Sequence, residues 1–306
     1  VLVVARTAAS VSSAANHSSH PAYMSAKLLT LARDLQRRKA RERQQLFVCE
    51  GVRATEELMG SALDIRGALV APALVGAARG MQLREALDAR GVDVLEVDER
   101  EFESAATTDS PQGILAIAAI PDASIATLSI PPRSRLLVLD AVQDPGNAGT
   151  MLRTAAAMGA AATLAAPGTV DLWNAKVVRS AMGALFHYPA LAVTWDALDT
   201  LLADHQIPLW GADATGQSIE SIAPPSSVAL VVGNEGAGLS SEARSRCATS
   251  AVIRRLGRSG SSRATASASA MPSITGILMS ESKRSNRPFS RENASSASLP
   301  SAVATT

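Results

Sequence analysis

The chain has 306 residues, of which 47% are apolar and 19% are charged, and its formal net charge is +1. This length and apolar content are enough for one large domain or two ordinary ones. The small net charge excludes a polycation, so a nucleic-acid partner would have to be met by a local basic patch.

The cysteines, histidines and hydropathy exclude further classes of protein. Cys49 and Cys247 are far apart and lack metal-like spacing, which predicts reduced thiols in a cytosolic protein. The four histidines have no Cys or carboxylate at ligand spacing, so we predict no metal site. No apolar run approaches the roughly 18 residues that span a bilayer. We therefore expect a cytoplasmic protein that does not enter a membrane.

The first half of the chain predicts a small α/β domain over residues 24–120. Residues 1–23 resemble a signal peptide poorly, and we expect them to be disordered or to lie upstream of the natural start. Leu28, Leu31 and Leu35 then follow at helical spacing. A basic cluster comes next, and strands are predicted at LFVCEG (46–51), DIRGALVAP (64–72), VDVLEVDEREFESA (92–105) and GILAIAAI (113–120). Residues 121–135, which carry Pro and Ser, predict a linker.

The second half predicts a parallel α/β domain over residues 136–284. RLLVLDAV (135–142) is the near-continuous apolar run of a buried parallel strand. Further strands are predicted at 161–167, 188–193, 208–214 and 226–232, with helices between them. Such alternation favours a parallel sheet. Residues 285–306 have low complexity and predict a disordered tail.

A glycine-bearing turn follows the first strand of this second domain. PGNAG (145–149) places small residues and Asn147 before a helix, where backbone N–H groups can face an anion. Arg153 lies one to two turns into that helix and can point back to the same cleft. Taken alone the turn is weak evidence, because most such turns are merely tight connections.

A second turn, VVGNEGAGLS (231–240), repeats this arrangement at another strand end. Its glycines allow close backbone approach, and Asn234 and Glu235 place polar groups at the carboxyl end of a strand, where open α/β sheets bind ligands. The spacing differs from the dinucleotide fingerprint, and no Gly-Lys-Ser/Thr follows as in a phosphate-binding loop. A nucleotide-binding oxidoreductase is therefore disfavoured.

A third segment, NAKVVRSAMGALFHYP (174–189), combines Lys176, Arg179 and Ser180 with small residues. It is either a helix packed through its small residues with two solvated charges, or a basic surface that holds phosphate. The residues themselves leave both interpretations open.

Together these segments resemble the SpoU (TrmH-like) family of RNA 2′-O-ribose methyltransferases. DPGNAGTMLRTA, NAKVVRSAMGALF and VVGNEGAGLS are similar to that family's first motif, middle segment and second motif, in the same order. RRKARERQQLFVCEGVR resembles part of the small N-terminal RNA-binding domain of the ribosomal-RNA members. The resemblance covers about residues 24–253.

The resemblance implies a fold, a cofactor and a set of site residues. The fold would be a parallel-sheet, knotted (SPOUT-type) α/β methyltransferase domain preceded by a small α/β RNA-binding domain, and the assembly a homodimer. The cofactor would be S-adenosyl-L-methionine. The implied catalytic residues are Asn147, Arg153 and Glu235; the cofactor-binding residues are Ala212, Gly233, Asn234, Gly236, Gly238, Ile253 and Leu256; and the RNA-binding residues are Arg38, Lys39, Arg41, Lys176, Arg179 and Ser180.

The chain departs from the family at the third motif, I-P-x-x-G-x-x-E-S-L-N, which should fall at 253–263. Ile253, Gly257 and Ser261 agree with it, but Arg, Gly, Ser and Arg replace Pro, Glu, Leu and Asn at 254, 260, 262 and 263. One explanation is real divergence with weakened cofactor binding. The other, which we favour, is translation of about residues 254–273 in a wrong reading frame of a GC-rich gene.

Two functions remain in competition. The first is an S-adenosylmethionine-dependent RNA 2′-O-methyltransferase that acts on ribosomal RNA. The second is an RNA-binding scaffold that has kept this fold but has weakened or lost the reaction. The two differ in their expected affinity for the cofactor.

Overall fold

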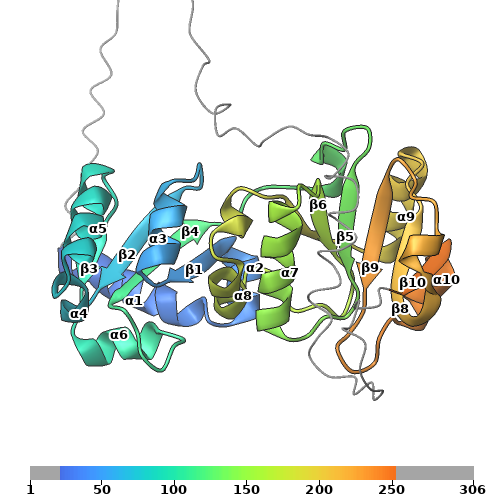
Figure 1. The fold of residues 1–306 in the computed structure, drawn as a ribbon. Helices are drawn as coiled ribbons and strands as arrows, with labels where there is room; N and C mark the ends of the chain where they lie inside the picture. The colour runs from blue at the N-terminus through green and yellow to red at the C-terminus, as the bar shows by residue number, and fades with distance from the viewer. Residues whose placement is uncertain (1–20, 253–306) are drawn as a thin grey trace, which may run out of the picture. The chain divides into compact units, whose positions relative to one another are not determined.

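The computed structural model describes residues 21–252 of the chain (Figure 1). Helix α1 (Pro21–Asp34) therefore begins inside the segment 1–23 for which we expect disorder. Ile253, Leu256, the altered segment 254–273 and the tail 285–306 lie outside the described residues. Within residues 21–252, the helices are all too short or too polar to cross a bilayer.

The described chain divides by its contacts into two compact units. The first contains residues up to 122 together with 145–149 and 171–187, and the second contains 123–144, 150–170 and the residues from 188 onward. Two segments of the predicted methyltransferase domain thus pack with the first unit, so contacts do not follow the predicted linker alone. The predicted domain boundary at 121–135 stays a prediction.

The first unit has a four-stranded mixed sheet in the order β1-β4-β2-β3. The strands are β1 (Leu46–Glu50), β2 (Ile65–Val70), β3 (Val94–Glu96) and β4 (Ile114–Ala119), and the helices are α1, α2 (Arg38–Gln44), α3 (Val52–Met59), α4 (Pro72–Val75), α5 (Ala78–Ala89), α6 (Glu99–Ala105) and α8 (Ala175–Ala181), with a 3-10 turn η2 (Ala184–Phe186). Figure 1 shows α3 and α5 on one side of the strands and α6 on the other. The strand predicted over 92–105 ends at Glu96, because an Asp98–Glu101 capping box starts α6.

The second unit has a six-stranded sheet in the order β10-β8-β9-β5-β6-β7, and every pair in it is parallel. Its strands are β5 (Arg135–Leu139), β6 (Ala162–Ala165), β7 (Ala190–Ala192), β8 (Leu209–Ser218), β9 (Val228–Val232) and β10 (Thr249–Val252), and its helices are α9 (Trp195–Asp204) and α10 (Ser241–Arg246), with 3-10 turns η1 (Ile125–Thr127) and η3 (Ile219–Ser221). Helix α7 (Pro145–Ala157) starts in the first unit and continues in the second. The predicted parallel α/β sheet is confirmed.

Strand side chains of the second unit alternate between two apolar layers. Leu136 and Val138 of β5 pack with Leu198 and Leu202 of α9 in one buried cluster. On β9, Ala229 and Val231 join that cluster, whereas Leu230 packs with Trp210 in another cluster. This alternation is the period of two that a strand imposes on its side chains. Both faces of the sheet are therefore covered, which explains the near-continuous apolar runs in the sequence.

Within the first unit, a buried ion pair and aromatic rings hold residues 171–187 to the N-terminal part of the chain. Nε and Nη2 of Arg41 donate to Asp171 Oδ2 at 2.8 and 2.6 Å, and Nη1 donates to the carbonyls of Leu35 and Gln36 at 2.7 and 2.9 Å. The Arg41 side chain is 4% exposed. The Phe47 ring lies 4.6 Å from that of Trp173 by their centroids. A buried charge with all these partners is structural.

We expect Asp171→Asn to lower the free energy of unfolding by about 3 kcal/mol, because it leaves the Arg41 charge buried without a counter-ion. Urea unfolding of the full chain, followed by tryptophan fluorescence, measures this change. The matched control is Glu42→Gln, which removes the carboxylate that Arg38 meets on the surface of α2. That variant should lose less than about 0.5 kcal/mol. Equal losses in the two variants would contradict a structural role for Arg41.

Candidate functional site

The carboxyl ends of β5 and β9 form the centre of the candidate site. From β5 the chain proceeds outward to β6 and β7, while β9 and β8 lie on the other side of β5. The boundary between β5 and β9 is therefore a topological switch point, the place where open α/β sheets bind ligands. Arg135–Leu139 pairs in register with Val228–Val232, so the residues that follow the two strands emerge side by side.

Asn234 joins the two strand ends. Its Nδ2 donates to the carbonyl of Ala141 at 3.0 Å, and its Oδ1 accepts from the amides of Gly236 and Ala237 at 2.9 and 3.0 Å. Backbone bonds of 2.9 Å in both directions between Asn234 and Gly238 close the loop. The structure thus brings together Gly233, Asn234, Gly236 and Gly238 as one tight turn.

Gly233 and Gly236 differ in the space that a side chain would have. A Cβ on Gly233 would lie 2.2 Å from the carbonyl oxygen of Gly238, so no side chain fits there. A Cβ on Gly236 would meet nothing nearer than Asn234 Oδ1 at 3.7 Å. The loop is therefore closed on its inner side and presents bare backbone at Gly236, as a site that reads a ligand through backbone groups requires.

Asp140 fixes the same loop from the end of β5. Its side chain is 1% exposed, and Oδ2 accepts from the amide of Ser240 at 2.6 Å. Ser240 in turn caps α10 by accepting from the amide of Ala243 at 3.1 Å. Ala141, whose carbonyl Asn234 binds, has a φ of 53°, in the left-handed region. A strained non-glycine residue at a strand end is a frequent feature of functional sites.

Ala212, predicted to bind the cofactor, lies in an excursion of β8. Pairing of β8 with β9 ends at Gly211, and pairing with β10 passes from Gly211 directly to Gln217. Residues 212–216 therefore leave the ladder. Asp213 holds this excursion by accepting from the amide and hydroxyl of Thr215 at 2.9 and 2.8 Å and from Arg244.

The three predicted catalytic residues occupy different surroundings. Asn147 is half-buried in the first turn of α7, Arg153 is exposed two turns further along it, and Glu235 is exposed on the loop after β9. Gly149, between the first two, packs against α8: a Cβ there would lie 2.5 Å from Ser180 Cβ and 2.7 Å from the Val177 carbonyl oxygen. The small residue Gly149 of the first motif therefore allows α7 and α8 to pack closely, whether or not a ligand binds near this motif.

The predicted RNA-binding residues divide into accessible and inaccessible side chains. Arg38, Lys39 and Lys176 are exposed, and Arg179 and Ser180 are half-buried on α8. Arg41 is buried in the ion pair with Asp171, and its assignment to RNA is therefore wrong. The sequence placed it in a run of surface charges, but helical geometry turns this member of the run into the core.

Comparison with known proteins decides the family. The model of the SpoU rRNA Methylase family matches residues 134–262, and that of the MRM3-like substrate binding domain matches residues 30–116. The 23S rRNA (guanosine(2553)-2'-O)-methyltransferase RlmP of Bacillus subtilis is 33% identical over 207 residues, which are 67% of this chain and 78% of that protein. The chain belongs to the SpoU rRNA methylase family. The resemblance stated from the motifs is thus confirmed.

Two further similarities show how far the likeness extends. The crystal structure of an AdoMet-bound rRNA methyltransferase from Sinorhizobium meliloti superimposes with a TM-score of 0.67 at 25% identity, covering 84% of this chain and 94% of that one. The mitochondrial rRNA methyltransferase 3A of Danio rerio is 44% identical over 105 residues, which are 32% of this chain. The chain thus spans about a quarter, 24%, of that longer relative. The similarity to the Sinorhizobium structure shows that the chain has the SpoU-type fold.

Several residues of the SpoU domain that the motifs did not indicate support the site. Asp140 ends an apolar strand, and an acidic residue at such a position was the signal that could have revealed it. Asp213 and Arg244 are 31 residues apart and had no sequence signal. Within residues 21–252, no three His, Cys, Asp or Glu side chains are grouped to hold a metal.

We expect the stability provided by Asp213 to disappear in acid. The Thr215 amide, then the Thr215 hydroxyl and Arg244, hold the pKa of Asp213 below its ordinary value. A lowered carboxyl pKa stabilises the fold above the unfolded-state pKa, and this contribution is lost as pH falls through the folded-state pKa. Asp213→Asn should therefore lower the Tm at pH 7, and the difference from the parent should shrink progressively as pH falls below about 4. A difference that stays constant from pH 7 to pH 3 would contradict this role.

Proposed function

We propose that the chain is an RNA 2′-O-methyltransferase that uses S-adenosyl-L-methionine and acts on ribosomal RNA. The observation that carries the proposal is the closed loop at the β5/β9 switch point, with Asn234 bound to Ala141, in a chain of the SpoU family. The name of the Bacillus subtilis relative states 2′-O-methylation of 23S rRNA, and the Sinorhizobium structure is AdoMet-bound. Both support the assignment.

The described residues fit one side of a nucleoside site. The bare backbone at Gly236 follows β9, and the half-buried Ala212 follows Gly211, where β8 stops pairing with β9. Backbone amides and carbonyls at such ends can hydrogen-bond an adenine edge, and small residues permit the close approach. We assign Gly233, Asn234, Gly236, Gly238 and Ala212 to this side. Ile253 and Leu256 complete the proposed set and lie outside the described residues.

The chemistry requires positioning and the removal of one proton. S-adenosylmethionine supplies an electrophilic methyl group on a sulfonium. The residues of the site would hold the ribose 2′-oxygen in line with that methyl group, and the hydroxyl proton would pass to solvent water. A guanidinium is a donor and not a base in proteins, so we assign Arg153 to hold the RNA phosphate and to stabilise the charge that develops on the oxygen. Asn147 and Glu235 are assigned to the same catalytic centre.

RNA recognition, assembly and location complete the proposal. We assign Arg38, Lys39, Lys176, Arg179 and Ser180 to RNA contacts, since side chains that are not fully buried can meet phosphates. The domain is proposed to be knotted and the assembly a homodimer, as the family resemblance implies. We propose a cytoplasmic location, which the similarity to the Bacillus subtilis relative supports.

Arg153→Ala should reduce methyl transfer at least about a hundredfold, because it removes charge stabilisation that is made in the transition state. Affinity for S-adenosylmethionine and the thermal unfolding midpoint should remain those of the parent. Transfer of labelled methyl groups to deproteinised ribosomal RNA measures the rate, and calorimetry measures the affinity. Arg100→Ala, an exposed arginine on α6, is the matched control and should be fully active. Full activity in Arg153→Ala would refute the assigned role.

Asn234→Ala should weaken S-adenosylmethionine binding about tenfold or more, because the variant loses three hydrogen bonds that shape the loop. Titration calorimetry on the full chain measures this affinity. Thr200→Ala, which removes an exposed hydroxyl on α9, serves as the control. Absence of binding by the parent itself at millimolar ligand would favour the alternative, an RNA-binding scaffold without the reaction.

A further inference from the structure

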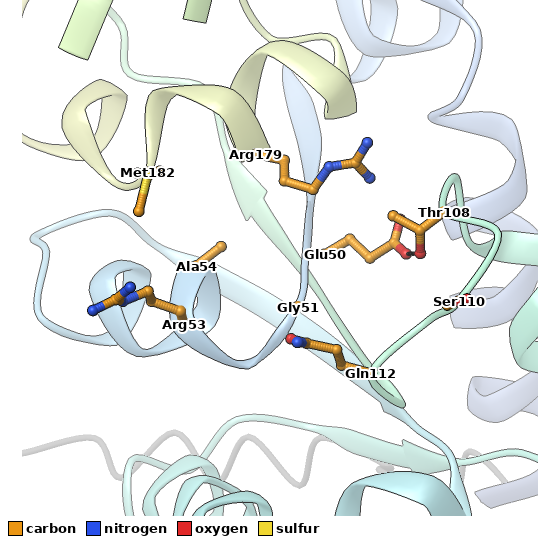
Figure 2. Close-up of a pocket in the computed structure, with 9 residues that line it drawn as sticks. All are labelled: Glu50, Gly51, Arg53, Ala54, Thr108, Ser110, Gln112, Arg179 and Met182. Atoms are coloured by element: carbon orange, nitrogen blue, oxygen red, sulfur yellow. Dashed lines mark hydrogen bonds between the residues drawn. The ribbon is translucent and has the colours of Figure 1, made fainter. Parts of the chain in front are cut away.

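A pocket of about 310 Å³ lies in the first unit (Figure 2), whereas the β5/β9 loop belongs to the second. Figure 2 shows side chains from three segments around it: the end of β1 with the start of α3, the loop before β4, and α8. Its lining residues are Glu50, Gly51, Arg53, Ala54, Thr108, Ser110, Gln112, Arg179 and Met182. Its volume is in the range that binds small organic ligands.

One guanidinium nitrogen of a residue that lines the pocket has no hydrogen-bond partner among the described residues. Nη1 of Arg179 is buried, and no acceptor among the described residues meets it. Leaving a buried donor unsatisfied costs about 1–3 kcal/mol, so an acceptor bound next to this nitrogen would be favoured. Glu50 does not supply it, because the Glu50 carboxylate accepts from the amide and hydroxyl of Thr107 at 2.8 and 2.7 Å and from the hydroxyl of Thr108. The exposed Arg53 adds a second positive charge to the lining.

The start of α3 adds backbone donors to the same pocket. Gly51 precedes the helix with a φ of 104° and provides no side-chain cap. The Val52 amide donates to Gln112 Oε1 at 2.9 Å. Within the described part of the chain no acceptor meets the next two amides, of Arg53 and Ala54, which a helix cannot satisfy internally. Two guanidinium groups and two helix-start amides together favour a phosphate.

One wall of the pocket is apolar and firmly held. Met182 is 45% exposed and has a φ of 49°, which ends α8. The next residue, Gly183, is packed so closely that a Cβ would lie 2.8 Å from Glu57 Cβ. An exposed thioether on a fixed backbone can pack against an aromatic ring, and a nucleobase presents such a face. The Gln112 amide lies across the pocket, where it can reach a base edge (Figure 2).

We propose that this pocket binds one nucleotide of the substrate RNA. The phosphate lies against Arg53, Arg179 and the start of α3, and the base packs on Met182. An acidic peptide would satisfy the two arginines but would leave the thioether wall without a ring to pack against. The inference rests on the proposed function, since it takes RNA as the substrate. It gives Arg179 a definite partner, and it adds Arg53, Ser110 and Gln112 to the residues that recognise RNA.

Fluorescence anisotropy of a labelled single-stranded RNA of mixed sequence, with the full chain, tests the pocket. Arg53→Gln and Arg179→Gln should each weaken binding about tenfold and reduce the slope of log Kd against log salt by about one. Arg66→Gln, an exposed arginine on β2 of the same unit, is the matched control and should bind like the parent. Parent-like binding in both pocket variants would overturn the proposal.

A second variant separates a pocket from a diffuse positive surface. Ser110→Trp fills the exposed mouth without removing a charge, and it should weaken RNA binding about as much as Arg53→Gln. Gln82→Trp places the same ring on the exposed side of α5, away from the lining, and should bind like the parent. Parent-like binding by Ser110→Trp would overturn the pocket even if both arginines mattered.

Competitors identify the ligand. Guanosine 5′-monophosphate should displace the RNA more effectively than inorganic phosphate, because it also offers a base. Displacement by polyglutamate but not by the nucleotide would overturn the RNA assignment in favour of an acidic protein segment. Displacement by inorganic phosphate and the nucleotide at equal concentration would reduce the site to a simple anion site and overturn the proposal.

The failure of this inference is distinguishable from failure of the proposed function. Methyl transfer by the parent to deproteinised ribosomal RNA tests the function and does not depend on the pocket variants. An active parent with unaltered pocket variants refutes the pocket alone. An inactive parent whose RNA affinity falls in Arg53→Gln and Ser110→Trp refutes the enzyme and supports the pocket.

Discussion

The parallel pairing of β5 with β9 is the constraint on which the candidate active site depends. It brings Ala141 and Asn234, which are 93 residues apart, to within one hydrogen bond. A slip of one residue would turn the side chains of β9 to the opposite face and would separate these strand ends. Asp140 then ties the loop to the start of α10 through Ser240. The hydrogen bonds of the loop around Asn234 can therefore form only because the sheet brings two distant segments together.

The first unit depends on a different kind of constraint. Asp171 and α8 come from the second half of the sequence, yet a buried ion pair and stacked rings hold them to β1 and α2. Removing a charge and its partner from water is costly, so this arrangement persists because Arg41 donates to several acceptors at once. The same attachment sets α8 beside the start of α3. The pocket with Arg179 and Met182 exists because of it.

The sequence predicted the second unit well, because its information is local and periodic. Apolar runs such as LLVLD (136–140) and the glycine turns are short patterns, and β5 to β9 occur where such patterns stand, whereas β10 was not predicted. The order of the three motifs indicated the family, which the periodicity of apolar residues alone cannot indicate. The site loop was also accessible to prediction, since Asn234 and its glycines are consecutive.

What the sequence could not predict involves pairs far apart in the chain. In the sequence, Arg41 is one of five basic residues between positions 37 and 43. Its burial depends on Asp171, which lies 130 positions later. The ion pair of Arg244 with Asp213 and the presence of Arg53 and Arg179 in the lining of one pocket are likewise contacts between residues far apart in the chain. Charge runs indicate exposure on average, and they do not reveal which member faces inward.

The position of β10 gives the altered third motif a physical meaning. Thr249 and Ser250 pair in parallel with Trp210 and Gly211, and Val252 pairs with Ser218 beyond the 212–216 excursion. The strand thus runs toward the same carboxyl edge as β8 and β9, on the side of β8 away from β9. We therefore propose that a change in the third motif, which follows β10 in the sequence, alters cofactor binding. If residues 254–273 reflect a wrong reading frame, restoring the frame should change cofactor affinity while leaving the Arg53 and Arg179 contribution to RNA binding unaltered.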